Sequence, residues 1–227
     1  MFSGASNFVN STDTTFFFIV AVSVFFLIVI TVSMIYFVIK YSRKRNPRAK
    51  NIHGNIPLEV TWTVIPTILV LIMFWMGWAG YKQLANAPDD AMNVDVTAQM
   101  WKWSFKYPNG VSSDTLYVAV NKPVKVLLHS RDVNHSFFVP AFRVKKDVIP
   151  NRNNSAWFMA DKVGTFDIFC AEYCGLNHSH MLSKVVVMPQ DSFDNWLNMQ
   201  AIRDSLKSMQ ASAPDTEPAK TDTTKTM

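Results

Sequence analysis

The sequence predicts two transmembrane helices followed by a small all-β domain, a sandwich or a barrel. Two long apolar stretches lie near the amino terminus, and each exceeds the roughly 20 residues that a bilayer-spanning helix needs. From residue 92 onward the pattern changes to short segments rich in β-branched and aromatic residues, with turn residues between them. The 227 residues therefore have room for one membrane anchor and one folded domain.

The first predicted span covers residues 16–39, which are 24 positions without a charge. No Lys or Arg precedes Lys40, so the stretch lacks the positively charged start of a cleaved signal peptide. We therefore expect this span to be retained as a transmembrane helix. The short polar segment before it, residues 1–15, is expected on the outer side of the membrane.

The loop between the two spans, residues 40–55, fixes the expected orientation. It contains six basic residues and no acidic one, namely Lys40, Arg43, Lys44, Arg45, Arg48 and Lys50. Cytoplasmic loops carry an excess of Lys and Arg, so this loop is expected on the cytoplasmic side. Adding Lys82 and subtracting Asp13 and Glu59 gives 6 + 1 − 2 = +5, the whole formal charge of the chain. The basic composition thus reflects membrane topology and does not indicate a nucleic-acid partner.

The second predicted span covers residues 56–81. Glu59 near its start is the only acidic residue of this stretch, and Pro66 lies inside it. Trp75, Trp78 and Tyr81 gather near its outer end, as is typical of the aromatic belt at a membrane interface. The chain is then expected to leave the membrane through a polar hinge, residues 82–91.

Residues 92–189 are expected to form the β-domain. Eight stretches are predicted as strands, at residues 94–97, 101–107, 115–120, 124–130, 136–139, 156–160, 165–170 and 184–188. Residues 190–207 are predicted as an amphipathic helix, because apolar side chains recur there at helical spacing. Residues 208–227 are polar and are expected to be disordered.

The candidate chemistry lies between Cys170 and Met181. These twelve residues hold both cysteines of the chain, two histidines and a methionine. Thiolate, thioether and imidazole together favour copper, whereas the nearest competitor, zinc, does not use methionine. A second imidazole ligand would come from His135. One copper would leave a cysteine unused, whereas two coppers bridged by two thiolates would use both. The alternative is a structural disulfide between the two cysteines.

The pattern closely resembles the binuclear copper A motif of cytochrome c oxidase subunit II. The matching positions are His135, Cys170, Glu172, Cys174, His178 and Met181. The resemblance implies that both cysteines bridge two coppers, one completed by His135 and Met181 and the other by His178 and the backbone carbonyl of Glu172. It also implies a Greek-key cupredoxin sandwich with the metal loops at one end. Residues 51–66, around the start of the second span, resemble a signature of the same family.

Three further roles follow from the resemblance alone. Trp101 corresponds to the residue through which electrons enter, although an aromatic residue beside a metal loop can equally belong to the core. The Glu172 side chain corresponds to a ligand of a magnesium ion shared with subunit I. Glu59 corresponds to a residue near the mouth of a proton path, and its alternative role is an interfacial carboxylate exposed to water.

The resemblance implies that the chain is subunit II of a respiratory oxidase, anchored beside subunit I and further oxidase subunits. It would accept electrons one at a time from a cytochrome c, or from a complex-bound cytochrome, and pass them to haem in subunit I. Oxygen reduction and proton pumping would then occur on subunit I, so no catalytic residue is assigned to this chain. The β-domain would face the periplasm of a bacterial inner membrane, with the mitochondrial inner membrane as the alternative.

Two observations bear on the donor and on rival functions. Residues 89–200 contain 11 basic and 11 acidic residues, so a strongly basic donor is not expected from net charge. A quinol oxidase relative would lack the copper ligands that are present here. A membrane-tethered copper carrier or a zinc-binding module remains as a rival from another class.

Overall fold

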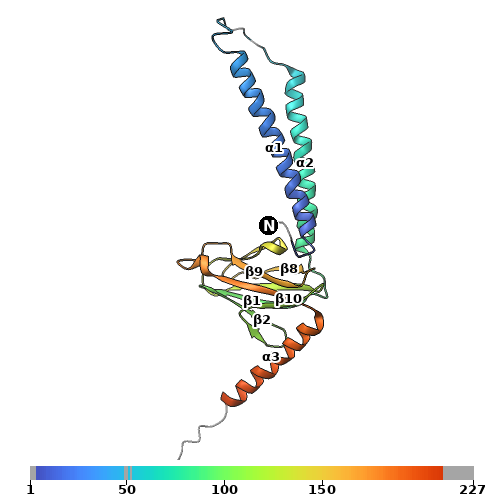
Figure 1. The fold of residues 1–227 in the computed structure, drawn as a ribbon, viewed down its shortest axis with the longest axis vertical. Coiled ribbons are helices and arrows are strands. Elements are labelled where there is room, and N and C mark those ends of the chain that lie inside the picture. Colours follow the sequence, from blue (N-terminus) through green and yellow to red (C-terminus); the bar gives the residue numbers. More distant parts are fainter. Residues whose placement is uncertain (1–3, 49–50, 52, 212–227) are drawn as a thin grey trace, which may run out of the picture.

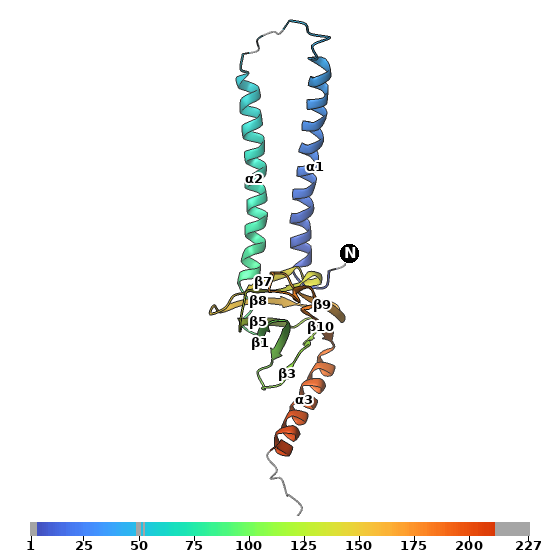
Figure 2. The same cartoon turned by 90° about the vertical axis from the view of Figure 1, so that its left-hand side faces the viewer.

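A computed structural model describes residues 4–48, 51 and 53–211, and it places a long helical hairpin on a β-domain (Figures 1 and 2). The hairpin consists of α1 (Val9–Lys40) and α2 (Ile56–Ala85). Helices of 32 and 30 residues measure about 48 and 45 Å, more than a hydrocarbon layer of about 30 Å. No side chain of either helix is buried, so their apolar surfaces are free to meet lipid or partner subunits. The two predicted helices are confirmed, and both are long and apolar enough to cross a membrane.

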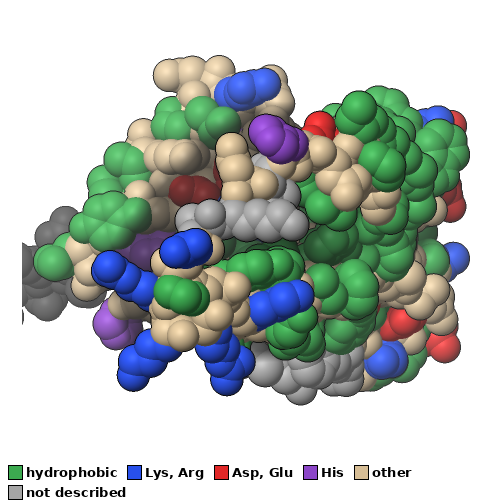
Figure 3. All heavy atoms as spheres, turned by 90° about the horizontal axis from the view of Figure 1, so that it is seen from above, with side chains coloured by type: hydrophobic (Ala, Val, Ile, Leu, Met, Phe, Trp, Pro, Cys, Tyr) green, Lys and Arg blue, Asp and Glu red, His purple; other side chains and the backbone are tan. Residues whose placement is uncertain are grey.

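The helices are longer than the predicted spans. The first helix begins at Val9 instead of residue 16, because the polar residues before the apolar stretch continue the helix. The second ends at Ala85 instead of residue 81. The basic loop lies at the hairpin tip, at the opposite end from the β-domain (Figure 1). Figure 3 looks down on this tip and shows Lys and Arg side chains gathered there. Lys50 of the predicted loop lies outside the described residues.

The β-domain is a sandwich of two five-stranded sheets. One sheet has the order β3-β2-β1-β5-β8 and the other β4-β10-β9-β6-β7. Both sheets are mixed, because β1 pairs with β5, and β4 with β10, in parallel. The chain crosses repeatedly between the sheets, as in a Greek-key sandwich. The strands are β1 (Met92–Gln99), β2 (Lys102–Lys106), β3 (Ser112–Ser113), β4 (Leu116–Ala119), β5 (Pro123–Ser130), β6 (His135–Val139), β7 (Val144–Val148), β8 (Asn154–Met159), β9 (Gly164–Cys170) and β10 (Leu182–Met188).

The core lies between the two sheets and follows from alternation along the strands. In β1 and β5 every second residue is buried while its neighbours face outward. The inward residues include Val96, Phe105, Leu128, Phe137, Phe158 and Ile168, all of them fully buried. Two strands, β3 and β7, were not predicted from the sequence. The β7 segment carries Lys145, Lys146 and Asp147, so its apolar content is low for a strand.

The amino-terminal segment before α1 joins the β-domain. The backbone N–H of Ala5 donates a 2.9 Å hydrogen bond to Ala141 O, and Ala5 O accepts a 3.1 Å hydrogen bond from the backbone N–H of Asp161. Phe8 is 2% exposed and packs edge-to-face on Trp157 of β8, with ring centroids 4.8 Å apart. This segment therefore closes one side of the sandwich and fastens it to the hairpin.

The carboxyl-terminal helix α3 (Gln190–Ala211) extends four residues beyond the predicted range. Phe193 is buried, and the Trp196 ring stacks on Tyr117 of β4 at a centroid distance of 4.2 Å. The helix thus attaches to the sandwich at its amino-terminal half. The predicted disordered tail lies, from residue 212 onward, outside the described residues.

Candidate metal centre

The candidate ligands are brought together at one end of the second sheet. His135 is the first residue of β6, and Cys170 is the last residue of β9, the neighbouring strand. A backbone hydrogen bond of 3.1 Å from Ala171 N to Ser136 O fastens the start of the following loop to β6. The loop between β9 and β10 then supplies Cys174, His178 and Met181. The β-sheet pairing therefore places a histidine beside ligands that come 35 or more residues later.

The six predicted ligand positions form one connected group of donor atoms. The two sulfurs lie 3.7 Å apart, and each is close to one imidazole. Cys170 Sγ lies 3.7 Å from His135 Nδ1 and 3.3 Å from the backbone oxygen of Glu172. Cys174 Sγ lies 3.5 Å from His178 Nδ1 and 3.8 Å from Met181 Sδ. The structure thus brings together every ligand position that the sequence motif predicts.

The spacing and chemistry of these donors fit a bound metal. Two donors that share one tetrahedral ion at about 2.0–2.3 Å lie roughly 3.3–3.8 Å from each other. The donor distances in the group fall in this range. A sulfur–sulfur distance of 3.7 Å excludes a disulfide, whose bond is about 2.05 Å, and both cysteines are free thiols. The set of two sulfurs, two imidazoles, a thioether and a carbonyl has the softness that copper prefers.

The group is shielded from water on most sides. His135 and Met181 are fully buried, and Cys174 is 3% exposed. Burial, together with the neighbouring Cys170 sulfur, raises the pKa of the Cys174 thiol to about 11. The thiolate is the metal-binding form, so metal binding would displace protons from this pair.

Asp132 holds His135 from the side away from the metal donors. Its Oδ1 lies 2.8 Å from His135 Nε2, and its Oδ2 accepts a 2.7 Å hydrogen bond from the backbone N–H of Met100. Burial raises the pKa of Asp132, but these hydrogen bonds and that from Val133 N–H more than offset it and lower the pKa overall. The carboxylate thus fixes the imidazole so that Nδ1 faces the sulfurs. From the sequence, Asp132 could be given a supporting role only because the stretch around His135 resembles the corresponding loop of the family.

Trp101 lies directly beside the ligand loop. A Cβ atom placed on Gly175 would lie 3.5 Å from the Trp101 ring and 3.6 Å from Met100 Sδ. Gly175 has φ +116°, a backbone conformation that favours glycine, and it follows Cys174 directly. The glycine therefore permits close contact between the indole and the chain next to a cysteine ligand. Trp101 is partly exposed, so it connects the metal site to the surface.

The Glu172 side chain points away from the sulfurs, while its carbonyl points toward them. Its Oε1 forms a salt bridge of 2.8 Å with Nζ of Lys145, a residue of β7. This hydrogen bond to Glu172 raises the pKa of Lys145. The other predicted carboxylate, Glu59, lies far away in the first turn of α2, where its Oε1 accepts a 3.2 Å hydrogen bond from Asn55 N–H. The structure therefore gives Glu59 a helix-capping contact.

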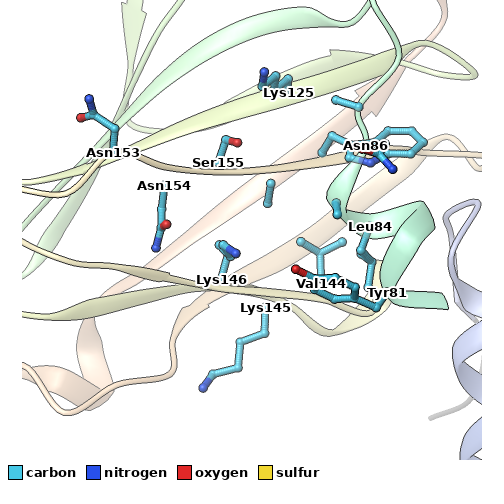
Figure 4. Close-up of a pocket in the computed structure, with 14 residues that line it drawn as sticks. Tyr81, Leu84, Asn86, Lys125, Val144, Lys145, Lys146, Asn153, Asn154 and Ser155 are labelled. Carbon is cyan, nitrogen blue, oxygen red and sulfur yellow. The ribbon is translucent and has the colours of Figure 1, made fainter. Parts of the chain in front are cut away.

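A cavity at the junction between hairpin and sandwich is separate from the candidate metal centre. It has a volume of about 700 Å³ and lies between the end of α2 and strands β5, β7 and β8. Figure 4 shows Tyr81 and Leu84 on one side of it and Asn153 and Asn154 on the other. None of the six metal-ligand positions lines it. It belongs to the junction between hairpin and sandwich.

Comparison with known proteins identifies the family. Residues 110–188 match "Cytochrome C oxidase subunit II, periplasmic domain", and residues 2–76 match "Cytochrome C oxidase subunit II, transmembrane domain". The "Alternative cytochrome c oxidase subunit 2" of Bradyrhizobium diazoefficiens is 32% identical over 199 residues, covering 74% of this chain and 72% of that protein. The chain belongs to the cytochrome c oxidase subunit II family. Copper binding is implied by this membership.

Two more relatives extend the comparison. "Cytochrome c oxidase subunit 2" of Alkalihalophilus pseudofirmus is 35% identical over 191 residues, covering 79% of this chain and 56% of that protein. The crystal structure of the periplasmic domain of subunit II from Bradyrhizobium japonicum superimposes with a TM-score of 0.50 at 30% identity, covering 52% of this chain and 99% of that one. The chain thus spans little more than half the length of the first of these relatives. The predicted fold class and the outer-face location of the β-domain are confirmed.

Proposed function

We propose that this chain accepts electrons one at a time from a cytochrome c into a binuclear copper centre and passes them to haem in subunit I. Oxygen reduction coupled to proton pumping would then occur on subunit I. The observation that supports this proposal most directly is the convergence of two thiols, two imidazoles, a thioether and a carbonyl, at neighbouring distances of 3.3–3.8 Å. Bound copper would supply a site that gains and loses single electrons.

The residues around the site suit electron transfer because they restrict movement. His135 is fully buried and held by Asp132, while Cys170 and Cys174 are anchored by the end of β9 and by the packed loop. A preformed ligand cage changes little when its charge changes, which lowers the reorganisation that each transfer requires. A copper carrier, in contrast, needs ligands that release the metal readily.

The pairing of the ligands is the one that the resemblance to the subunit II family implies, and the contacts are compatible with it. The two cysteine sulfurs would be shared between the coppers. We assign His135 and Met181 to one copper, and His178 with the Glu172 carbonyl to the other. In this assignment each copper takes one ligand that lies beside Cys170 Sγ, which is His135 or the Glu172 carbonyl. Its other ligand lies beside Cys174 Sγ and is Met181 or His178.

Three roles outside the copper ligands are part of the proposal. Trp101 would be the residue through which electrons enter, because its ring contacts Gly175 next to the ligand Cys174. Glu172 would offer its carboxylate to a magnesium ion shared with subunit I, and Lys145 now holds that carboxylate in place. Glu59 would lie near the mouth of a proton path on the cytoplasmic side.

The first test is the metal content and electron spin resonance spectrum of the full chain in detergent. The full chain is needed because Ala5 and Phe8 are buried in the sandwich, and a fragment starting at the hinge would lack them. We expect two coppers per chain that share one unpaired electron, and Cys170→Ser should abolish this signal. His180→Ala is the matched control, since this imidazole lies in the same loop but is exposed. One copper with a localised spin, or preferential zinc binding, would favour the carrier or zinc-module function instead.

A further inference from the structure

A small cationic groove lies on the outer face of the first sheet, beside Trp101. It has a volume of about 120 Å³ and is lined only by polar residues, namely Thr97, Gln99, Lys102, Ser104 and Arg131. Two of these five carry a positive charge, and no acidic residue lines the groove. We call this feature the Lys102 groove.

Strand pairing explains why these residues meet. In the antiparallel register of β1 and β2, Gln99 lies opposite Lys102 and Thr97 opposite Ser104. Their side chains share the solvent-facing side, because the residues between them point into the core. Arg131 joins them from the end of β5 through a 3.0 Å hydrogen bond from its backbone N–H to Ala98 O. The groove is therefore built on three paired strands.

The positive charge of the groove is not neutralised within the described chain. Lys102 and Arg131 are exposed, and neither forms an ion pair with any described residue. The neighbouring Asp132 already binds His135 and two backbone N–H groups. A wider cleft on the other side of Lys102 includes Asp114, Asp167 and Lys184, of which the last two pair with each other at 3.1 Å.

Apolar side chains exposed close to the groove indicate a protein partner. Met100, next to Trp101, is 42% exposed. Leu176, next to Gly175 and hence to the Trp101 ring, is 88% exposed, and Tyr173 of the same loop is 79% exposed. Grouped exposed apolar residues with a polar border are typical of protein–protein contact sites. A carboxylate is the protein group that best fits a lysine, a guanidinium and neutral hydrogen-bond donors.

We propose that the Lys102 groove receives acidic side chains of the electron donor, so that the donor presents an apolar haem edge with an acid-rich rim. The proposal rests on the proposed function, because it assumes that electrons enter at Trp101. In the complex, acidic groups of the donor meet Lys102 and Arg131, while apolar atoms of the donor cover Met100, Trp101 and Leu176. Attraction between opposite charges then speeds encounter and orients the donor.

The test is stopped-flow reduction of the purified oxidase that contains this chain. The probes are two reduced c-type cytochromes, one with an acid-rich and one with a lysine-rich haem-edge rim. We expect the acid-rich cytochrome to reduce the copper faster at low salt, with a rate constant that falls about tenfold or more as salt rises. Lys102→Glu should lower this low-salt rate constant about tenfold and should raise that of the lysine-rich cytochrome.

The matched control is Lys122→Glu. Lys122 is also exposed, but it precedes β5 at the end opposite Arg131, and the eight residues of that strand span about 26 Å. This separation exceeds the Debye length of about 10 Å at 0.1 M salt, so the control should change neither rate constant by more than about twofold. Copper content and the spin resonance spectrum check that each variant retains its metal site.

Two results would overturn the proposal, and they are distinguishable. If the lysine-rich cytochrome is preferred at low salt, or if Lys102→Glu and Lys122→Glu behave alike, the assignment of the groove is wrong while the proposed function stands. If a small uncharged reductant reduces the copper but neither cytochrome does, the proposed electron-accepting function fails together with the groove.

Discussion

At the scale of single residues, the candidate metal centre is supported by a carboxylate, that of Asp132, which lies outside the predicted ligand set. Asp132 connects His135 Nε2 to the backbone N–H of Met100, so it sets both the imidazole orientation and the position of the segment that carries Trp101. Loss of such a partner usually costs 10–100-fold in metal affinity. We expect Asp132→Ala to weaken copper binding by about this factor, measured by competition with a chelator of known affinity.

Asp95→Ala provides the comparison for this prediction. Asp95 also lies near a histidine, His129, but at 3.8 Å and with both side chains largely exposed. Its removal should leave copper affinity within about twofold of the unaltered chain. Equal affinities for the two variants would show that Asp132 does not position the ligand.

Gly175 offers a second residue-scale prediction. Its φ of +116° is unfavourable for alanine, and the added methyl group would lie in van der Waals contact with the Trp101 ring. Gly110→Ala serves as the control, because Gly110 has φ +88° but no atom within 4 Å of the added carbon. Both variants should lose about 1–3 kcal/mol of stability in thermal unfolding. Only Gly175→Ala should also change Trp101 fluorescence and slow electron transfer from a cytochrome.

The ligands could be predicted from the sequence because five of the six lie within the twelve residues from Cys170 to Met181, where spacing alone determines proximity. His135 could be proposed only from its resemblance to the family motif, since it is the pairing of β6 with β9 that brings it to Cys170. The hydrogen bond that Asp132 accepts from His135 and the salt bridge between Lys145 and Glu172 depend on how loops and edge strands come together. Residue spacing carries no information on such contacts.

At the scale of elements, the amino-terminal segment should contribute strongly to the stability of the sandwich. Phe8 is 2% exposed and packs on Trp157, whose indole N–H donates a 2.9 Å hydrogen bond to Gln83 O of α2. Truncation of a buried phenylalanine typically costs 3–5 kcal/mol. We expect Phe8→Ala to lower the unfolding free energy of the sandwich by about 3 kcal/mol, measured by denaturation of the full chain in detergent.

Phe16→Ala is the matched control, because Phe16 of α1 is 54% exposed on the hairpin surface. It should change the unfolding of the sandwich by less than about 0.5 kcal/mol. A similar loss for both variants would mean that the segment before α1 does not support the β-domain.

The sequence predicted the two helices and most strands because each has a strong local pattern. It did not predict that residues 5–8 join the sandwich, since their partners are Ala141, Met159 and Asp161, more than 130 residues away. A contact between residues distant in the sequence also helps to explain why α1 begins at Val9 and not at residue 16, where the predicted span begins. Asp13 in its first turns binds Arg143 at 2.7 Å, and this contact with the sandwich helps to order polar residues as helix.

At the scale of the whole molecule, the basic tip and the sandwich lie at opposite ends of the hairpin (Figure 2). We expect a membrane-impermeant thiol reagent to label Lys122→Cys only from the outer face and Arg45→Cys only from the cytoplasmic face. Vesicles of the two orientations provide the measurement. Labelling of both positions from the same side would contradict the two-span topology.

Copper should stabilise the sandwich without stabilising the hairpin. Its ligands come from β6, from β9 and from the loop before β10, so a bound metal connects segments that would separate on unfolding. At free copper about 1,000 times the dissociation constant, binding adds about 4 kcal/mol to the unfolding free energy. Removing copper with a chelator should therefore lower the calorimetric transition of the sandwich, while helical circular dichroism from α1 and α2 persists beyond it. Cys170→Ser should unfold at the lower transition temperature whether or not copper is present. If the transition temperature of the unaltered chain does not depend on copper, the metal does not connect these strands.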